Sequence, residues 1–322
     1  MKQPKTKTKA VLITGESLPG RRPAKGAHML IHAIFQHKAS YLFMLPFSLV
    51  FFTFTVWSVL SAMGYSFTIF NILEKPTFVW LDNYVRLFLK DEVFLIALKN
   101  TIVFGVVLGA VGYFLSLIFA WLISEMNPKL RSVLTLLFYA PSMVNIYVVW
   151  KTFFSSDSYG VVNAYLMQLG ITHAPIAWLQ NEAYMFPVVM LILVWASLST
   201  SFLSFIAGFQ TIDPTLYEAG AVDGIRNRFQ EFWFITLPSI KPQLAFGAVM
   251  SITSAFSVGD AITALVGFPS PNYALHTVAT HLTDYGFTRF DMGYACAIAT
   301  VLFFIMVFTN KIVQKMLRKV GQ

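Results

Sequence analysis

The residue types that perform catalysis or hold a cofactor do not occur in this sequence at the spacings those functions need. Residues 15–20 have the glycine spacing of a phosphate-binding loop, but two arginines follow where Lys and Ser or Thr are required. The six histidines form no H-E-x-x-H pattern, and His276 and His281 have the wrong spacing for one helical face. We therefore expect no catalytic group, no metal site and no cofactor on this chain, and we place the histidines in loops or at the membrane interface.

Composition limits the classes of protein that can carry these residues. The chain has 322 residues, of which 57% are hydrophobic and 12% charged, and 32 are Phe. Soluble domains carry roughly 25% charged residues, so a soluble globular protein, a disordered chain and a secreted disulfide scaffold are all excluded. The single cysteine, Cys296, permits no intrachain disulfide. A net charge of +8 would suit nucleic acid, but the positions of the charges favour a polytopic membrane protein and no nucleic-acid partner.

Charge-free blocks long enough to cross a membrane, which takes about 20 apolar residues, divide the chain. An acidic or basic residue inside a membrane span is the usual mark of ion coupling. By these boundaries no predicted span contains one, which disfavours an ion-driven transporter. A seventh stretch, 261–283, is rich in Gly and Pro and is expected to be a structured or re-entrant loop. Six blocks are predicted spans, and they lie between Lys38 and Glu74, Lys99 and Glu125, Arg131 and Lys151, Glu182 and Asp213, Lys241 and Asp260, and Asp291 and Lys311.

The distribution of basic residues predicts the orientation. With the N-terminus inside, 17 of the 23 Lys and Arg lie on the cytoplasmic side, so both termini are expected there. Residues 1–38 form a basic tail that lacks the apolar core of a signal peptide. Within this tail, 28–37 is either a short interfacial helix or a partly ordered segment near anionic lipid. Residues 39–322 are expected to form one six-helix transmembrane domain.

The cytoplasmic loop 213–238 is the most informative segment. Asp213 followed by proline is typical of a helix start, residues 216–221 form a short helix with small side chains, and Gly224 suits its end. Residues 229–235 begin a second amphipathic segment. A short helix with a small-residue face fits a groove on a partner, whereas the alternative is a loop that lies along the lipid headgroups. The physical pattern alone leaves both open.

Specific residues of this loop resemble a known motif, the E-A-A…G…I-x-L-P loop of ABC importer permeases. Gly220 stands where Ala is usual, and ten residues separate Gly224 from Ile235 where the pattern has nine. The resemblance covers the chain after residue 40. It rests on Glu218-Ala219-Gly220, Gly224 and Ile235-Thr236-Leu237-Pro238, on Tyr217 and Asp223, which resemble the carbohydrate-importer branch, and on Leu81-Asp82-Asn83-Tyr84 through Asn100-Thr101 and Tyr285-Gly286-Phe287 through Gly293-Tyr294-Ala295.

The resemblance implies an all-α ABC type I importer permease in the inner membrane of a bacterium, which carries an oligosaccharide or polysaccharide by alternating access. It implies a second permease subunit, identical or homologous, two ATPase subunits that bind ATP and Mg, and a soluble extracytoplasmic solute-binding protein. Glycerol phosphate or another small polar solute remains an alternative cargo, and an ATPase-independent secondary transporter is a more distant alternative. The residues implied in ATPase coupling are Tyr217, Glu218, Ala219, Gly220, Asp223, Gly224, Leu237 and Pro238.

Sugar recognition requires polar groups that bond hydroxyls and aromatic faces that contact the ring. Most Ser and Thr hydroxyls in the spans are expected to bond their own or a neighbouring helix. An acidic cargo would favour basic residues near the path, and the blocks contain none. The predicted substrate path consists of Asn145, Tyr147, Trp150, Trp195, Ser199 and Ser254.

Overall fold

A computed structural model describes residues 38–143, 146–198 and 200–318, so the predicted basic tail lies outside the described residues apart from Lys38. The chain divides into two units, 1–59 and 60–322. In the first, α2 (Lys38–Phe51) continues through a π turn, η1 (Phe52–Val56), into the start of α3 (Trp57–Tyr65).

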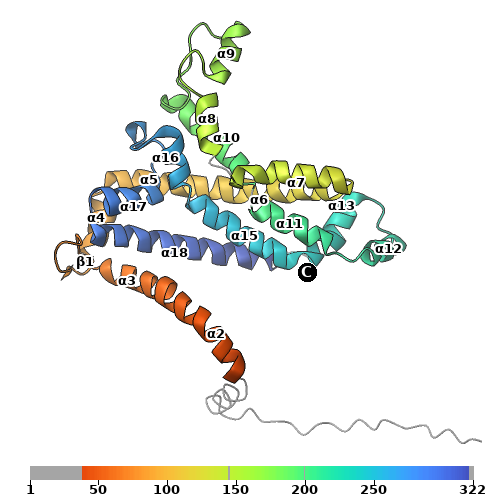
Figure 1. The fold of residues 1–322 in the computed structure, drawn as a ribbon, viewed down its shortest axis with the longest axis horizontal. Coiled ribbons are helices and arrows are strands. Elements are labelled where there is room, and N and C mark those ends of the chain that lie inside the picture. Colours follow the sequence, from red (N-terminus) through yellow and green to blue (C-terminus); the bar gives the residue numbers. More distant parts are fainter. Residues whose placement is uncertain (1–37, 144–145, 199, 319–322) are drawn as a thin grey trace, which may run out of the picture. The chain divides into compact units, whose positions relative to one another are not determined.

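The second unit is almost entirely helical, with one two-stranded hairpin in which Thr68 pairs with Phe78 (Figure 1). Many of its helices begin where a side chain accepts a backbone N–H, as Asp91 does from Phe94 at 2.9 Å. After α3, its elements are β1 (Thr68–Ile69), β2 (Thr77–Phe78), α4 (Asp82–Leu89), α5 (Glu92–Val106), η2 (Val107–Val111), α6 (Gly112–Ser124), α7 (Pro128–Met143), α8 (Ile146–Phe153), α9 (Val161–Gln168), α10 (Glu182–Ala196), α11 (Thr200–Gln210), α12 (Thr215–Val222), α13 (Arg228–Glu231), η3 (Phe232–Thr236), α14 (Leu237–Ser239), α15 (Lys241–Phe256), α16 (Gly259–Val266), η4 (Pro271–Tyr273), α17 (Val278–Thr283), η5 (Asp284–Thr288) and α18 (Met292–Leu317).

The described helices can be compared with the six predicted spans. Four helices are long and apolar enough to cross a membrane, and α15 and α16, bent by 45° relative to each other, form either a fifth, broken span or a span with a re-entrant segment. In the region of the predicted third span, the structure describes α7 up to Met143 and α8 from Ile146, and residues 144–145 lie outside the described residues. The predicted structured or re-entrant loop at 261–283 contains most of α16, followed by η4 and α17. The four long helices are Leu42–Tyr65, Glu92–Ser124, Glu182–Gln210, which runs over Ser199 outside the described residues, and Met292–Leu317.

The helices extend beyond the charge-free blocks and therefore carry charged residues near their ends, among them Lys99 and Asp260. Lys99 belongs to the helix Glu92–Ser124, whose 33 residues exceed the length that the hydrocarbon requires. Asp260 lies in the first turn of α16, directly after the bend, and its side chain is exposed. The expectation of spans free of ionisable residues thus holds for the apolar centres of these helices but not for their ends.

Within the second unit, α6 packs on α11, α11 on α15, and α15 on α18. Figure 1 shows α12 and α13 at the end of this bundle where the chain ends, and α4, α17 and the hairpin at the opposite end. We call these the loop end and the hairpin end. One buried apolar cluster joins α6, α11 and α15 at the loop end, a second surrounds α10 and α16, and a third joins α5, α17 and α18 at the hairpin end.

Candidate functional site

The short helix predicted in the loop 213–238 is α12, at the loop end of the bundle (Figure 1). The Asp213 carboxylate accepts the backbone N–H of Thr215 at 3.0 Å. This bond lowers the pKa of Asp213, because it stabilises the charged form. The helix starts where the sequence predicted because Asp213 satisfies one of its otherwise unpaired N–H groups.

Gly224 ends α12 by backbone conformation. Its φ is +95°, a region that residues with a Cβ rarely adopt. The N–H of Ile225 donates to the carbonyl of Gly220 at 2.9 Å, and that of Gly224 donates to Ala221 at 3.3 Å. This pair of bonds is the Schellman arrangement, which requires a left-handed residue after the helix.

One face of α12 is held by the chain's own next segment. A Cβ on Gly220 would lie 2.5 Å from Cδ1 of Ile235, so its lack of a side chain allows close packing within this chain. The Tyr217 hydroxyl and Thr236 Oγ1 form a 3.0 Å hydrogen bond between the same two segments. Tyr217 is half-buried and Gly220 buried, so these two residues fix the helix and present little surface to a partner.

The remaining implied coupling residues fall into two groups. Glu218, Ala219, Asp223 and Gly224 are exposed on the outer side of α12. Leu237 is buried in the loop-end cluster, and Pro238 is half-buried beside it. The exposed group is available to a partner, while the buried group anchors the loop to the bundle.

The additional residue between Gly224 and Ile235 precedes a π turn. In η3 the N–H of Leu237 donates to the carbonyl of Phe232, five residues back. Such a turn takes up one residue more than an α-helical turn. Phe232, Leu237 and Ile240 all remain buried, so the helix keeps its inward face after the wider turn.

Of the predicted path residues, the structure brings two tryptophans together. The rings of Trp150 on α8 and Trp195 on α10 are in edge-to-face contact with centroids 5.5 Å apart, and Tyr147 packs against the same apolar cluster. The buried Nε1–H of Trp150 has no hydrogen-bond partner among the described residues. Ser254 is exposed on α15, while Asn145 and Ser199 lie outside the described residues.

Several hydroxyls in the spans bond within the protein, as expected for most of them, whereas those of Ser116 and Thr135 have no partner among the described residues. Ser201 Oγ lies 2.8 Å from Ser251 Oγ and donates to the carbonyl of Gly247 at 2.9 Å. Thr253 donates to the carbonyl of Val249 in its own helix at 2.9 Å. These groups are satisfied and contribute to helix packing.

The sequence analysis missed a polar side of α7. Arg131, Thr135 and Tyr139 line a cavity of about 540 Å³ with Gln210 of α11. Their spacing of four residues places them on one helical face, so the pattern was visible in the sequence. It was overlooked because the charge-free block was defined to begin after Arg131.

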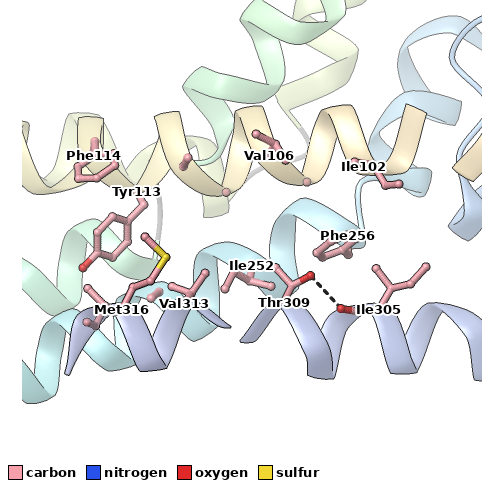
Figure 2. A pocket seen from close by; sticks show the side chains of 15 residues that line it. Ile102, Val106, Tyr113, Phe114, Ile252, Phe256, Ile305, Thr309, Val313 and Met316 are labelled. Carbon is pink, nitrogen blue, oxygen red and sulfur yellow. Dashed lines mark hydrogen bonds between the residues drawn. The ribbon is translucent and has the colours of Figure 1, made fainter. Parts of the chain in front are cut away.

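A separate apolar cavity of about 360 Å³ lies between α5–α6, α15 and α18 (Figure 2). Two of its lining hydroxyls already donate to backbone carbonyls, Tyr113 to Leu244 at 3.2 Å and Thr309 to Ile305 at 2.8 Å. Its other lining side chains are apolar, so it lacks polar groups for a sugar.

The hairpin end contains a buried polar network with two histidines, His276 in a loop, as expected, and His281 in α17, where a loop or interfacial position was expected. His276 Nε2 lies 3.1 Å from His281 Nδ1, and His281 Nε2 lies 3.1 Å from Asp91 Oδ2, which also accepts from Tyr294 at 2.7 Å. Both histidines are at least 97% buried. Burial lowers their pKa values, that of His276 to about 4, so His281 contacts Asp91 as a neutral hydrogen-bond donor.

The other stretches of the motif resemblance support this network. Asn100 donates to the carbonyls of Ala274 and His276, both at 2.9 Å, and Thr101 Oγ1 accepts the N–H of Val278 at 2.8 Å. The residues of these stretches thus help to hold the hairpin end together.

This arrangement of a helical membrane bundle with a fixed loop helix corresponds to a known family. Residues 112–320 match the family described as binding-protein-dependent transport system inner membrane component. The match covers more than half of the chain, so the chain belongs to this family, and it is a permease subunit of an ABC transporter, not an enzyme. The resemblance and the all-α fold class inferred from the sequence are therefore confirmed.

The chain is similar to several characterised or solved proteins. It is 34% identical over 276 residues to "Probable ABC transporter permease protein YesP" of Bacillus subtilis (strain 168), covering 83% of this chain and 86% of that protein. It is 28% identical over 282 residues to the arabinooligosaccharides transport system permease protein AraP of the same organism, covering 86% and 88%. A solved bacterial ABC transporter involved in the import of the acidic polysaccharide alginate has a chain of TM-score 0.70 and 25% identity, covering 91% of this chain and 100% of that chain.

Proposed function

We propose that this chain forms part of the membrane path of an importer that carries an oligosaccharide or polysaccharide into the cell. ATP, with Mg, binds and is hydrolysed on two separate ATPase subunits, and a second permease, identical or homologous, completes the path. A soluble extracytoplasmic solute-binding protein delivers the cargo. Similarity to the arabinooligosaccharide permease and to the alginate importer supports a carbohydrate as the cargo.

The observation that carries this proposal is the form of α12. The helix is short, is ended by Gly224 and is fixed by the Tyr217–Thr236 hydrogen bond and the Gly220–Ile235 contact. A helix that transmits movement between subunits must be held rigidly by its own chain on one face and be exposed to the partner on the other face. The outer side carries Glu218, whose charge and capacity to accept hydrogen bonds suit a polar groove on the ATPase.

Recognition of the sugar centres on the Trp150–Trp195 pair. The two indole rings provide apolar faces for a sugar ring, and the unpartnered Nε1–H of Trp150 is a donor that a sugar hydroxyl satisfies. Asn145, Tyr147, Ser199 and Ser254 are proposed as further contacts along the path.

The proposed orientation places both termini, α12 and the basic tail in the cytoplasm, and the hairpin end outside. It rests on the excess of Lys and Arg in the predicted inner segments. Cysteine labelling in a variant lacking Cys296 tests it, because a cysteine at Glu218 should resist a membrane-impermeant reagent in sealed cells. Labelling of that cysteine from outside would overturn the orientation.

The test of function pairs ATPase capture with sugar uptake. In Glu218→Lys we expect normal membrane insertion, weakened capture of the ATPase from detergent extracts and loss of uptake. Glu74→Lys makes the same charge change on an exposed residue between β1 and β2, at the other end of the bundle, and should retain both. Wild-type capture and uptake in Glu218→Lys would show that the loop merely lies at the membrane surface.

A further inference from the structure

The cavity of about 540 Å³ between α7 and α11 is lined by a positively charged side chain, that of Arg131, which has no ion-pair partner among the described residues. Arg131 is half-buried, and no carboxylate of the described residues lies within salt-bridge distance of it. Its only hydrogen bond among them is a long one, from Nη1 to the carbonyl of Ser124 at 3.4 Å. A partly desolvated guanidinium has an unfilled capacity for a carboxylate or phosphate, which it binds through two parallel N–H donors.

A second group in the same cavity also lacks a partner. The Thr135 hydroxyl lies one helical turn from Arg131, and its oxygen is buried without a hydrogen bond among the described residues. A threonine in a helix ordinarily bonds the carbonyl four residues back, as Thr253 does here. The Thr135 hydroxyl is thus free to bond a ligand beside the guanidinium, and Tyr139 and Gln210 extend the same polar wall.

The position of the cavity connects it with the cargo path. Its two walls belong to α7, which precedes the helix bearing Trp150, and to α11, which follows the helix bearing Trp195. Lys151, the residue after Trp150, lines a second cavity of about 450 Å³. Asp157 lines it too, but its oxygens accept the N–H groups of Tyr159 and Gly160 and the hydroxyl of Ser155. The segments that adjoin the two tryptophans along the chain therefore contribute a cation to each of two cavities.

We propose that the α7–α11 cavity is a subsite for the anionic group of an acidic saccharide, with Arg131 binding the anion and Thr135 bonding a neighbouring oxygen. This inference rests on the proposed function and narrows its cargo to carbohydrates that carry a carboxylate or a phosphate. The sequence shows no basic residue inside the charge-free blocks. Arg131 stands at the boundary of the third block and lines the cavity, so a basic residue can still contact the cargo.

The test uses the complete transporter in cells and measures uptake over a panel of saccharides. The panel contains galacturonate di- to tetrasaccharides, the neutral galactose oligosaccharides of the same lengths, hexose phosphates and arabinooligosaccharides. For the acidic compounds that the wild type imports, Arg131→Gln should lower uptake below saturation by roughly 10- to 150-fold, the loss expected for a charge-assisted hydrogen bond. Arg131→Lys should recover part of it, and Thr135→Val should lose less than Arg131→Gln.

Matched controls separate a cargo contact from a structural role. Lys129→Gln removes a cation two residues away that is exposed and does not line the cavity, and it should leave uptake unchanged. ATPase capture and basal ATP hydrolysis should be normal in every variant. Preference for galacturonates over hexose phosphates, or the reverse, identifies which anion the site takes.

The outcomes distinguish this inference from the function on which it rests. Import of neutral saccharides alone by the wild type, or an equal loss of neutral and acidic uptake in Arg131→Gln, would overturn the anionic subsite and leave the sugar importer intact. Wild-type uptake of acidic compounds by Arg131→Gln would overturn it as well. Import of no saccharide of the panel by the wild type would count against the proposed carbohydrate function itself.

Discussion

Substitution of Gly224 tests why the end of α12 matters for coupling. A Cβ at this position would meet nothing within 4 Å in the chain, so alanine is sterically tolerated in the free subunit. The difficulty is the φ of +95°, where an L-residue costs about 1–2 kcal/mol. Alanine and leucine should therefore be similarly harmful, because both carry the Cβ that causes the strain.

The magnitude follows from the strain. If docking on the ATPase requires the observed end of α12, a cost of about 1–2 kcal/mol lowers affinity by roughly 5- to 30-fold. Asparagine tolerates the left-handed region better than alanine, so Gly224→Asn should bind more tightly than Gly224→Ala. The assay is a titration of the purified ATPase subunit against the detergent-solubilised permease variants, followed by uptake in cells.

Gly170 provides the matched control. It has a φ of +67°, has nothing within 4 Å of an added Cβ, and follows α9 in the same way that Gly224 follows α12. Gly170→Ala should introduce similar strain without weakening ATPase binding. Loss of binding in Gly224→Leu but not in Gly224→Ala would refute the strain argument and favour a steric clash with the partner. Wild-type binding in every Gly224 variant would exclude α12 as the docking helix.

Three further predictions concern the path, the hairpin end and the π turn. Trp150→Ala and Trp195→Ala should each lower sugar uptake by about 2- to 12-fold with normal expression, while Trp195→Phe should retain most uptake; unchanged kinetics in both alanine variants would remove the pair from the path. Because His276 takes up a proton with a pKa of about 4 when folded but near 6.5 when unfolded, stability should fall by up to about 3 kcal/mol as the pH drops from 6.5 to 4; a melting temperature with equal pH dependence in wild type and His276→Gln would contradict this. Deletion of the exposed Phe234 should convert η3 to an α turn and leave the melting temperature nearly unchanged, whereas deletion of Ala245 in α15 should rotate the following residues by about 100° and prevent folding; equal tolerance of both deletions would refute the role assigned to the π turn.

The features that the sequence predicted well are local ones. The start of α12 at Asp213 and its end at Gly224 depend on one side-chain bond and one backbone conformation. Membrane-length helices follow equally directly from runs of apolar residues.

The features that could not be predicted from the sequence depend on contacts between distant segments. His281 and Asp91 are 190 residues apart in sequence, so no spacing rule brings them together. Gly220 also depends on a contact with another segment. Its small size suggested close approach to a partner subunit, but it instead allows Ile235 of the same chain to pack closely against α12. The polar face of α7 is different in kind, because its spacing was visible and only the choice of block boundary at Arg131 hid it.

The contacts of the second unit also connect the loop end with the aromatic pair. From α12, the Tyr217–Thr236 bond leads to η3, which continues through α14 into α15. Beyond its 45° bend, α15 is followed by α16, and α16 packs against both α8 and α10, the helices that carry Trp150 and Trp195. Close-packed helices shift as units and do not deform freely, so we expect a displacement of α12 to reach the two tryptophans along this series. The Gly224 and Trp195 variants therefore examine the two ends of one connection. The first should lose ATPase binding and uptake together, and the second should lose uptake while ATPase binding persists.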